Sequence, residues 1–106
     1  MSSESVPFPS LTEVDRLIHE PSRSVILAVL SAVHSADFLY LLRETSLTKG
    51  NLTVHLSKLE AAGYIKIEKT YRGKLPLTLC SITPEGSKAF ENYRRQLRTF
   101  LGGKLG

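Results

Sequence analysis

Cysteine is nearly absent from this chain of 106 residues, and this scarcity already excludes several kinds of protein. The one cysteine, Cys80, cannot form a disulfide within the chain or supply a thiolate zinc cage by itself, which fits a reducing cytoplasm. Long apolar runs are missing too, since the longest is the six residues from Val25 to Leu30, whereas a membrane helix needs about 20. The N-terminus has no basic segment that leads into an apolar one. We therefore expect neither a membrane span nor Sec-type export.

Motifs of catalysis and of metal binding are also lacking. The sequence contains no phosphate-binding glycine loop, no nucleophile elbow and no paired-carboxylate motif. Its histidines, His19, His34 and His55, are not spaced like metal ligands. We therefore expect no enzyme activity, no metal site and no cofactor.

What remains is an ordinary globular composition, with 42% apolar and 23% charged residues in a chain long enough for one domain. A domain this short buries only about two-thirds of the surface that its unfolded chain exposes, so self-association would add useful burial. Residues 1–42 hold two basic and five acidic side chains, residues 43–74 hold seven and three, and residues 75–106 hold five and two. Positive charge in the middle and C-terminal parts indicates a polyanionic partner, although such charge is often only solvated surface.

The N-terminal third predicts an arm followed by two helices. Residues 1–10 contain two prolines and four serines, a composition typical of a flexible arm. Apolar residues at helical spacing then predict a short amphipathic helix that Pro21 ends. Pro21 also begins a second helix, which is apolar on nearly every side. Such a helix must be covered all round, by the rest of the core or by a second subunit.

The middle of the chain predicts two helices joined by a sharp corner. Ser35 or Asp37 can cap the first of them. Thr48 caps the next helix, which runs to Ala62, where Gly63 supplies a left-handed C-terminal cap. Only about three residues separate these two helices, so they form a helix-turn-helix.

After Gly63 the apolar period changes from that of a helix to that of a strand. Alternation from Tyr64 to Tyr71, a turn at residues 72–74 and the segment LPLTLCSIT predict one β hairpin. Pro76 limits the second strand to an edge or bulge position at that point. Thr83 and Pro84 begin a last helix over residues 84–101, and residues 102–106 form a frayed tail.

The order of these elements, together with one stretch of sequence, resembles a known family. LTKGNLTVHLSKLEAAGYIKIEK, a basic turn and a second strand that ends in ITPEG are similar to winged-helix transcriptional regulators of the MarR and ArsR kind. The resemblance covers residues 11–101 and is most specific at residues 47–65 and 83–86. It implies a mainly α fold with a β hairpin (α+β), namely a winged helix-turn-helix DNA-binding domain with a C-terminal dimerisation helix.

The helix that follows Thr48 also suits DNA recognition on physical grounds. Its leucines share one face and dock on the core, with His55 at the edge of that face. The opposite face is small, polar and positively charged, which favours close approach to base edges and phosphates in a major groove. The predicted contacts are Thr48, Lys49, Asn51, Thr53, Val54, Ser57 and Lys58. The alternative is an ordinary solvated helix face.

The resemblance further implies that the hairpin is a wing that reaches the minor groove or the DNA backbone. The predicted wing contacts are Lys69, Arg72, Gly73 and Lys74. The alternative is an ordinary charged turn. Tyr64 and Tyr71 are more typical of packing than of base stacking.

Two apolar stripes predict a homodimer interface. The last helix carries apolar residues at steps of three, four and three, a spacing typical of a coiled-coil seam, at Phe90, Tyr93, Leu97 and Phe100. The predicted first helix supplies Leu11, Val14, Leu17 and Ile18. In the alternative, the last helix folds back over its own subunit.

Taken together, these features predict a cytoplasmic homodimer that binds specific double-stranded DNA and regulates transcription, as a repressor. A winged-helix module that binds another protein is the alternative, and salt dependence separates the two, because phosphate contacts release counterions. His55 is either a hydrogen-bonded residue at the core edge or a DNA contact, and Cys80 either fills space or senses redox state. No residue cluster indicates an effector ligand, and the sequence leaves the operator open.

Overall fold

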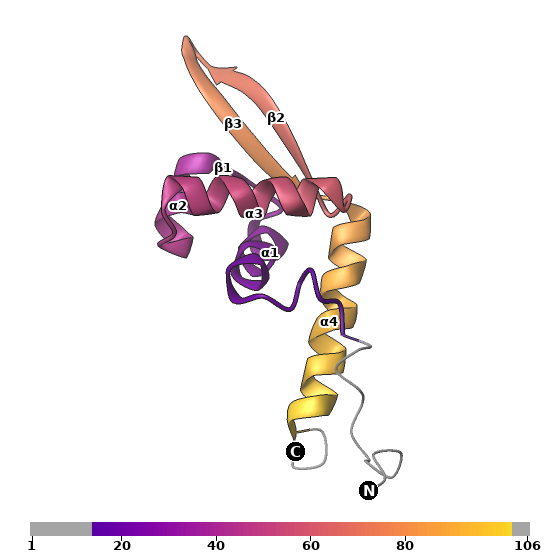
Figure 1. Cartoon of the computed structure of the whole chain (residues 1–106). Helices are drawn as coiled ribbons and strands as arrows, with labels where there is room; N and C mark the ends of the chain where they lie inside the picture. The colour runs from indigo at the N-terminus through magenta and orange to yellow at the C-terminus, as the bar shows by residue number, and fades with distance from the viewer. Residues whose placement is uncertain (1–13, 103–106) are drawn as a thin grey trace, which may run out of the picture.

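The computed structural model describes residues 14–102, which form helices and a small sheet (Figure 1). In chain order the elements are α1 (Pro21–Val33), β1 (Ser35–Asp37), α2 (Phe38–Thr45), α3 (Lys49–Ala61), β2 (Ile65–Arg72), β3 (Leu75–Ile82) and α4 (Pro84–Gly102). The predicted α+β class, with a helix-turn-helix, a hairpin and a C-terminal helix, is confirmed. The predicted arm, Leu11 and residues 103–106 lie outside the described residues, whereas Gly102, predicted to fray, still belongs to α4.

The predicted first helix is wrong over the part that the structure describes. Residues 14–20 form turns and bends, in which the His19 N–H donates to the Asp15 carbonyl at 2.8 Å and the Glu20 N–H to the Ile18 carbonyl at 2.7 Å. Asp15 Oδ1 accepts hydrogen bonds from the backbone N–H groups of Leu17 and Ile18, at 2.9 and 3.2 Å. Glu20 then caps α1 by accepting a hydrogen bond from the Arg23 backbone N–H at 2.8 Å.

Helix α1 begins at Pro21 as predicted and forms the centre of the core. Ile26, Leu27 and Leu30 are fully buried against residues from α2, α3, β3 and α4. Its opposite side is open, however, because Val25 is 44% exposed and Val33 39%. The expectation that this helix must be covered all round is therefore not met within one chain.

The hairpin belongs to a three-stranded antiparallel sheet, in the order β1-β3-β2, because a strand that the sequence analysis missed pairs with it. Strand β1 has only three residues, too few to show an alternating pattern, and its Ala36 lies opposite Cys80. It pairs with β3 only from Leu79 to Ser81. Pro76 lies opposite Tyr71 of β2, outside this range. The proline thus sits where the sheet is two-stranded, as its missing N–H requires.

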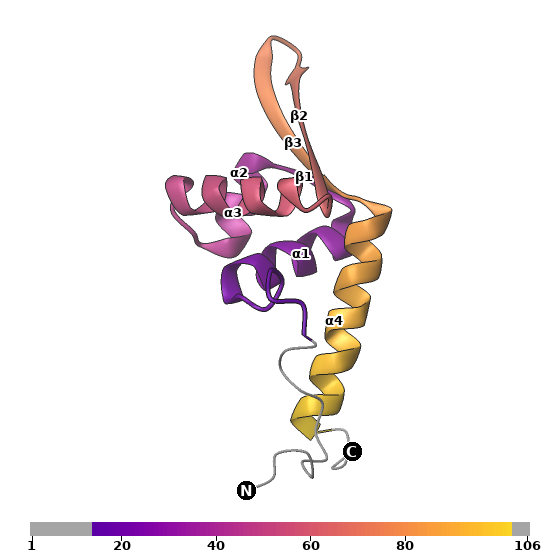
Figure 2. The same ribbon diagram turned by 45° about the vertical axis from the view of Figure 1, so that its right-hand side comes forward.

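The long part of the hairpin projects from one side of α3, and α4 extends away on the other side (Figures 1 and 2). Thr83 fixes this arrangement, because its Oγ1 accepts a hydrogen bond from the Gly86 N–H at 2.9 Å and donates one to the Gly63 carbonyl at 2.6 Å. A Cβ on Gly86 would lie 2.0 Å from the Tyr64 carbonyl oxygen. The start of α4 is therefore packed directly against the backbone that links α3 to β2.

Candidate nucleic-acid interface

The helix-turn-helix corner positions α3 on the surface of the domain. Helix α2 ends at Thr45, and Ser46 adopts a left-handed conformation with φ of 59° that turns the chain. Thr48 caps α3 as predicted, with its Oγ1 accepting a hydrogen bond from the Asn51 N–H at 3.1 Å. Leu52, Leu56 and Leu59 are buried. Their burial fixes which face of α3 is turned outward.

The outward face of α3 carries all the side chains predicted to contact DNA. The exposed residues of the helix and its cap include Thr48, Lys49, Asn51, Thr53, Val54, Ser57 and Lys58, and also Gly50, Glu60 and Ala61. The first turn contains no acidic residue, so the positive end of the helix dipole and the Lys49 ammonium reinforce one another. Free N–H groups at such a terminus bind phosphate oxygens. The geometry is that of a cationic, small-residue surface able to enter a groove.

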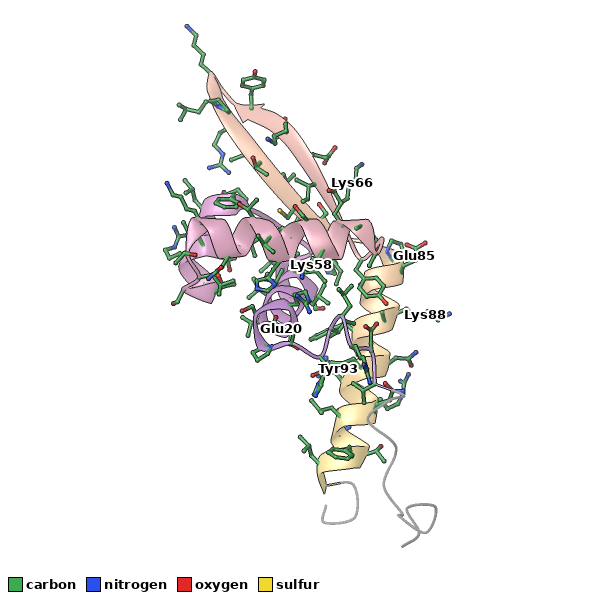
Figure 3. The ribbon with its side chains drawn as sticks, viewed as in Figure 1. Glu20, Lys58, Lys66, Glu85, Lys88 and Tyr93 are labelled. Carbon is green, nitrogen blue, oxygen red and sulfur yellow. The ribbon has the colours of Figure 1, made fainter. Side chains whose placement is uncertain are left out.

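His55 lies at the edge of the buried face rather than on the outward one. The Arg23 guanidinium donates a hydrogen bond from Nη1 to His55 Nδ1 at 3.1 Å and another from Nε to the Leu17 carbonyl at 2.6 Å. Glu20 Oε1 lies 3.9 Å from the same Nδ1, beneath α3 (Figure 3). These contacts favour the interpretation of His55 as a hydrogen-bonded residue at the core edge. Sequence analysis missed Arg23, because nothing in its spacing indicates that it joins residues 14–20 to α3.

The hairpin brings a second basic element next to α3. Gly73 and Lys74 form a two-residue turn, since Arg72 pairs with Leu75, and the φ of 65° at Gly73 suits glycine. Lys69 of β2 lies opposite Thr78 of β3. A groove of about 270 Å³ separates α3 from the sheet, lined by Phe38, Thr53, Leu56, Ser57, Ile67, Lys69 and Thr78. Sequence analysis did not identify Thr78 and Phe38 as residues of the candidate site. A two-residue turn at residues 73–74 would have predicted that Thr78 lies beside Lys69.

Arg72 is placed differently from the other wing residues. Its guanidinium Nη2 lies 3.5 Å from Asp37 Oδ2, so the side chain is turned back along the sheet toward β1. The arginine side chain nevertheless remains 72% exposed. The role of Arg72 in DNA binding stays a prediction. Contact with a phosphate would require the arginine to leave Asp37 or to bind both groups at once.

The residues predicted to form the dimer interface are divided by the structure. Val14, Ile18, Phe90 and Tyr93 are buried in the core of their own chain, as the alternative of a folded-back last helix requires. Leu17, Leu97 and Phe100 are half-buried, and Leu101 is exposed. Leu17, Leu97 and Phe100 thus keep more exposed surface than the four buried residues, and their contact with a second copy stays a prediction.

The N-terminal segment is tied to both α4 and the base of the wing. The Tyr64 hydroxyl donates a hydrogen bond to Asp15 Oδ2 at 2.6 Å. This bond, burial and the negative charge of Asp15 raise the pKa of Tyr64 to about 12. The Tyr93 hydroxyl and His19 Nδ1 form a hydrogen bond of 2.9 Å. Tyr64 and Tyr93 are thus packing residues with polar anchors.

Cys80 is fully buried on the central strand of the sheet. Burial, assisted by Glu60 and Asp37, raises the pKa of its thiol to about 11, so the reactive thiolate is disfavoured. This supports the space-filling interpretation of Cys80. In residues 14–102, no cluster of three or more His, Cys, Asp or Glu side chains could hold a metal ion. No helix within that same range is long and apolar enough to cross a bilayer.

Comparisons with known proteins agree with this geometry. A family model described as a winged helix DNA-binding domain matches residues 23–101. An uncharacterized protein of Methanocaldococcus jannaschii is 36% identical over 78 residues, which are 74% of this chain and 85% of the relative. A solved structure of a transcriptional regulator homologue from Pyrococcus horikoshii matches with a TM-score of 0.75 and 27% identity, over 79% of this chain and 83% of that one.

A MarR family transcriptional regulator from Silicibacter pomeroyi shares the fold, with a TM-score of 0.65 and 20% identity over 83% of this chain and 58% of that one. Regulators of the ArsR and PadR families share it as well. The resemblance to MarR and ArsR regulators is therefore confirmed. The family model describes a DNA-binding domain, and the solved structures named here are those of transcriptional regulators or a homologue of one.

Proposed function

The chain belongs to the winged helix DNA-binding domain family, and from this premise we propose that it is a homodimeric, sequence-specific transcriptional regulator that acts as a repressor. Residues 11–101 would be the DNA-binding domain, within which residues 84–101 supply the dimerisation helix. A regulator of this kind would act in the cytoplasm.

The outward face of α3 is the observation that carries the proposal. The leucines of α3 are buried, and Lys49, Asn51, Thr53, Ser57 and Lys58 are exposed. Asn51 and the hydroxyls can bond base edges, the lysines can bind phosphates, and Val54 can meet a thymine methyl group. The alternative module that binds a protein through this helix would favour an apolar outward face instead.

The wing, which projects from one side of α3, would add further contacts beside this helix face. Gly73 and Lys74 form its exposed tip, and Lys69 lies in the groove between the sheet and α3. A backbone that passes from the major groove at α3 toward the tip would meet both lysines. Such contacts position the protein on the duplex without reading its sequence.

A second copy fits the open side of α1. A groove of about 610 Å³ runs between α1 and α4, lined by Ser24, Val25, Ala28, Ser31, Ala32, Phe90, Tyr93, Arg94 and Leu97. The small side chains of α1 permit close helix packing, and this apolar surface has no cover within the described part of the chain. We place the dimer seam here, with α4 of each copy against α1 and α4 of the other.

Twofold symmetry then presents two α3 helices to one face of the duplex. The bound site should be an inverted repeat, with half-sites about one helical turn apart, roughly 10 base pairs. A repressor role follows if such a site overlaps a promoter, where the bound dimer would exclude polymerase.

Selection of bound duplexes from a random pool at physiological salt tests the proposal. The expected result is an enriched inverted repeat whose affinity falls steeply with salt, by about 0.9 log unit per log unit of salt for each phosphate contact. Enrichment without a repeat would contradict the dimer but not DNA binding. A pool without any enriched motif would contradict sequence-specific regulation.

A further inference from the structure

One face of the wing carries a row of leucines that the core does not use. Leu75, Leu77 and Leu79 alternate along β3 and therefore point to the same side of the sheet. The opposite side of the sheet bears Lys69 and Thr78, which line the groove against α3. We call the side with the three leucines the leucine face. The core cluster of the described residues contains none of the three.

The leucine face continues onto α2. A hollow of about 300 Å³ is lined by Leu39, Arg43, Arg72, Leu75 and Leu77, together with Asp37 and Pro76. Leu39 is 63% exposed and Leu75 is 70% exposed. A second hollow, next to Leu79 and Tyr40, shares Asp37 and Arg72 with the first. Adjacent exposed apolar side chains of this kind are typical of sites that bind another protein.

The charged residues around the leucine face indicate what kind of partner surface could bind there. Arg43, Arg72 and Asp37 line the hollow, where Arg72 is paired with Asp37. On the same side of the sheet, Glu68 lies opposite Leu79 and is paired with Lys66. Arg43 lies over the Tyr40 ring at 5.7 Å, and within residues 14–102 no carboxylate pairs with it. Arginine binds carboxylates in a bidentate manner and is enriched at protein interfaces. The face therefore complements a surface that combines apolar side chains with carboxylates.

DNA is a poor occupant of this face. A row of leucines offers no hydrogen bonds to phosphates, and the face is turned away from the side of the sheet that borders α3. A duplex on the outward face of α3 would leave the leucine face open. We propose that the leucine face, with Leu39 and Arg43, docks an acidic apolar segment of a partner protein while the chain is on DNA.

Titration of the isotopically labelled full chain with a synthetic peptide of leucine and glutamate tests this proposal. Amide chemical shifts should change saturably at Leu39, Leu75 and Leu77 and stay constant along α1 and α4. A matched peptide with glutamine in place of glutamate should bind at least tenfold more weakly. Equal binding of the two peptides, or changes centred on the groove between α1 and α4, would overturn the proposal.

Two variants separate loss of the surface from loss of the fold. Leu39→Ser with Leu77→Ser should weaken peptide binding at least tenfold. Arg43→Glu, which reverses an exposed charge and also removes the contact with the Tyr40 ring, should do the same while the circular dichroism spectrum stays native. Val54→Ser is the matched control, because Val54 is half-exposed on α3, and it should leave peptide binding unchanged. If Arg43→Glu binds the acidic peptide as well as the parent chain, the docking surface is refuted.

The same titration on the complex with duplex DNA distinguishes this proposal from the proposed function. We expect the same peptide affinity with and without saturating duplex. Competition between peptide and duplex would show that the face belongs to the DNA site and would overturn the docking proposal. Peptide binding by a chain that binds no duplex would contradict the proposed function alone.

Discussion

The guanidinium of Arg72 lies 3.5 Å from the carboxylate of Asp37, which ties the last residue of β2 to β1 at the start of α2. Asp37 has a second task, since its Oδ1 accepts a hydrogen bond from the Tyr40 N–H at 2.8 Å and caps α2. An ion pair whose arginine side chain is 72% exposed is weak. A DNA phosphate can therefore compete with Asp37 for the arginine, and the structure couples the wing to the base of α2.

Asp37→Asn should strengthen DNA binding. Asparagine caps a helix as well as aspartate does, so α2 should persist while Arg72 becomes available to phosphate. We expect duplex affinity to rise about two- to fivefold and the salt dependence to steepen, as measured by fluorescence anisotropy at several salt concentrations. Glu68→Gln is the matched control, because Glu68 pairs with Lys66 rather than with Arg72. An equal rise in duplex affinity for both variants would show that the loss of any negative charge, and not the release of Arg72, strengthens binding.

Ser57→Glu should abolish DNA binding and leave the fold intact. Ser57 is exposed near the middle of α3, where a carboxylate would face phosphates, and like charges in contact cost several kcal/mol. We expect more than about a hundredfold loss of affinity with an unchanged melting curve. Ser87→Glu adds the same charge to an exposed position on α4 and should change affinity little. Full binding by the Ser57 variant would exclude this face from the groove.

Ala28→Glu should convert the dimer into a folded monomer. Ala28 is exposed within its own chain and lines the groove between α1 and α4. A charge there should therefore disturb packing against a second copy without disturbing the core of its own chain. Sedimentation should show halved mass, with much weaker binding to an inverted repeat and native circular dichroism. Lys88→Glu, at an exposed position of α4 outside the groove, is the control. A parent chain that is monomeric at micromolar concentration would contradict the predicted seam.

Gly86→Ala should destabilise the chain severely. The new Cβ would meet the Tyr64 carbonyl oxygen at 2.0 Å, and a backbone oxygen cannot move aside without shifting β2. We expect the free energy of unfolding to fall by more than about 3 kcal/mol, as measured by urea denaturation. Gly50→Ala provides the contrast, because no atom lies within 4 Å of its Cβ position, and it should raise stability by up to about 1 kcal/mol. Similar changes in the free energy of unfolding for the two substitutions would contradict the close approach of α4 to the Tyr64 backbone.

Stability at alkaline pH should depend on Tyr64. Its pKa is about 12 in the folded chain and 10.0 ordinarily, so the folded state favours the neutral hydroxyl that donates to Asp15. The stabilisation is complete below pH 10 and is lost as the pH rises toward 12. The difference in unfolding free energy between the parent chain and Tyr64→Phe should therefore shrink over this range. A difference that is constant with pH would show that the hydrogen bond is not formed.

Local sequence alone was sufficient for most elements. Pro21, Thr48, Gly63 and Thr83 mark helix ends through their own backbone preferences, which do not depend on distant residues. The leucine spacing in residues 52–59 likewise fixes the inward face of α3, and therefore the outward one, before any tertiary contact is known. The candidate DNA surface was predictable for this reason.

Tertiary structure decided the features that depend on residues far apart in the chain. Residues 14–20 have helical spacing, but Asp15 binds nearby backbone N–H groups and Tyr64, so the segment turns instead. Strand β1 exists because Ala36 meets Cys80, and Arg72 faces Asp37 only because the sheet brings their strands together. On α4, Phe90 and Tyr93 are buried in the core, whereas Leu97 and Phe100 are half-buried. Periodicity shows which side of an element is apolar, whereas only packing decides what covers it.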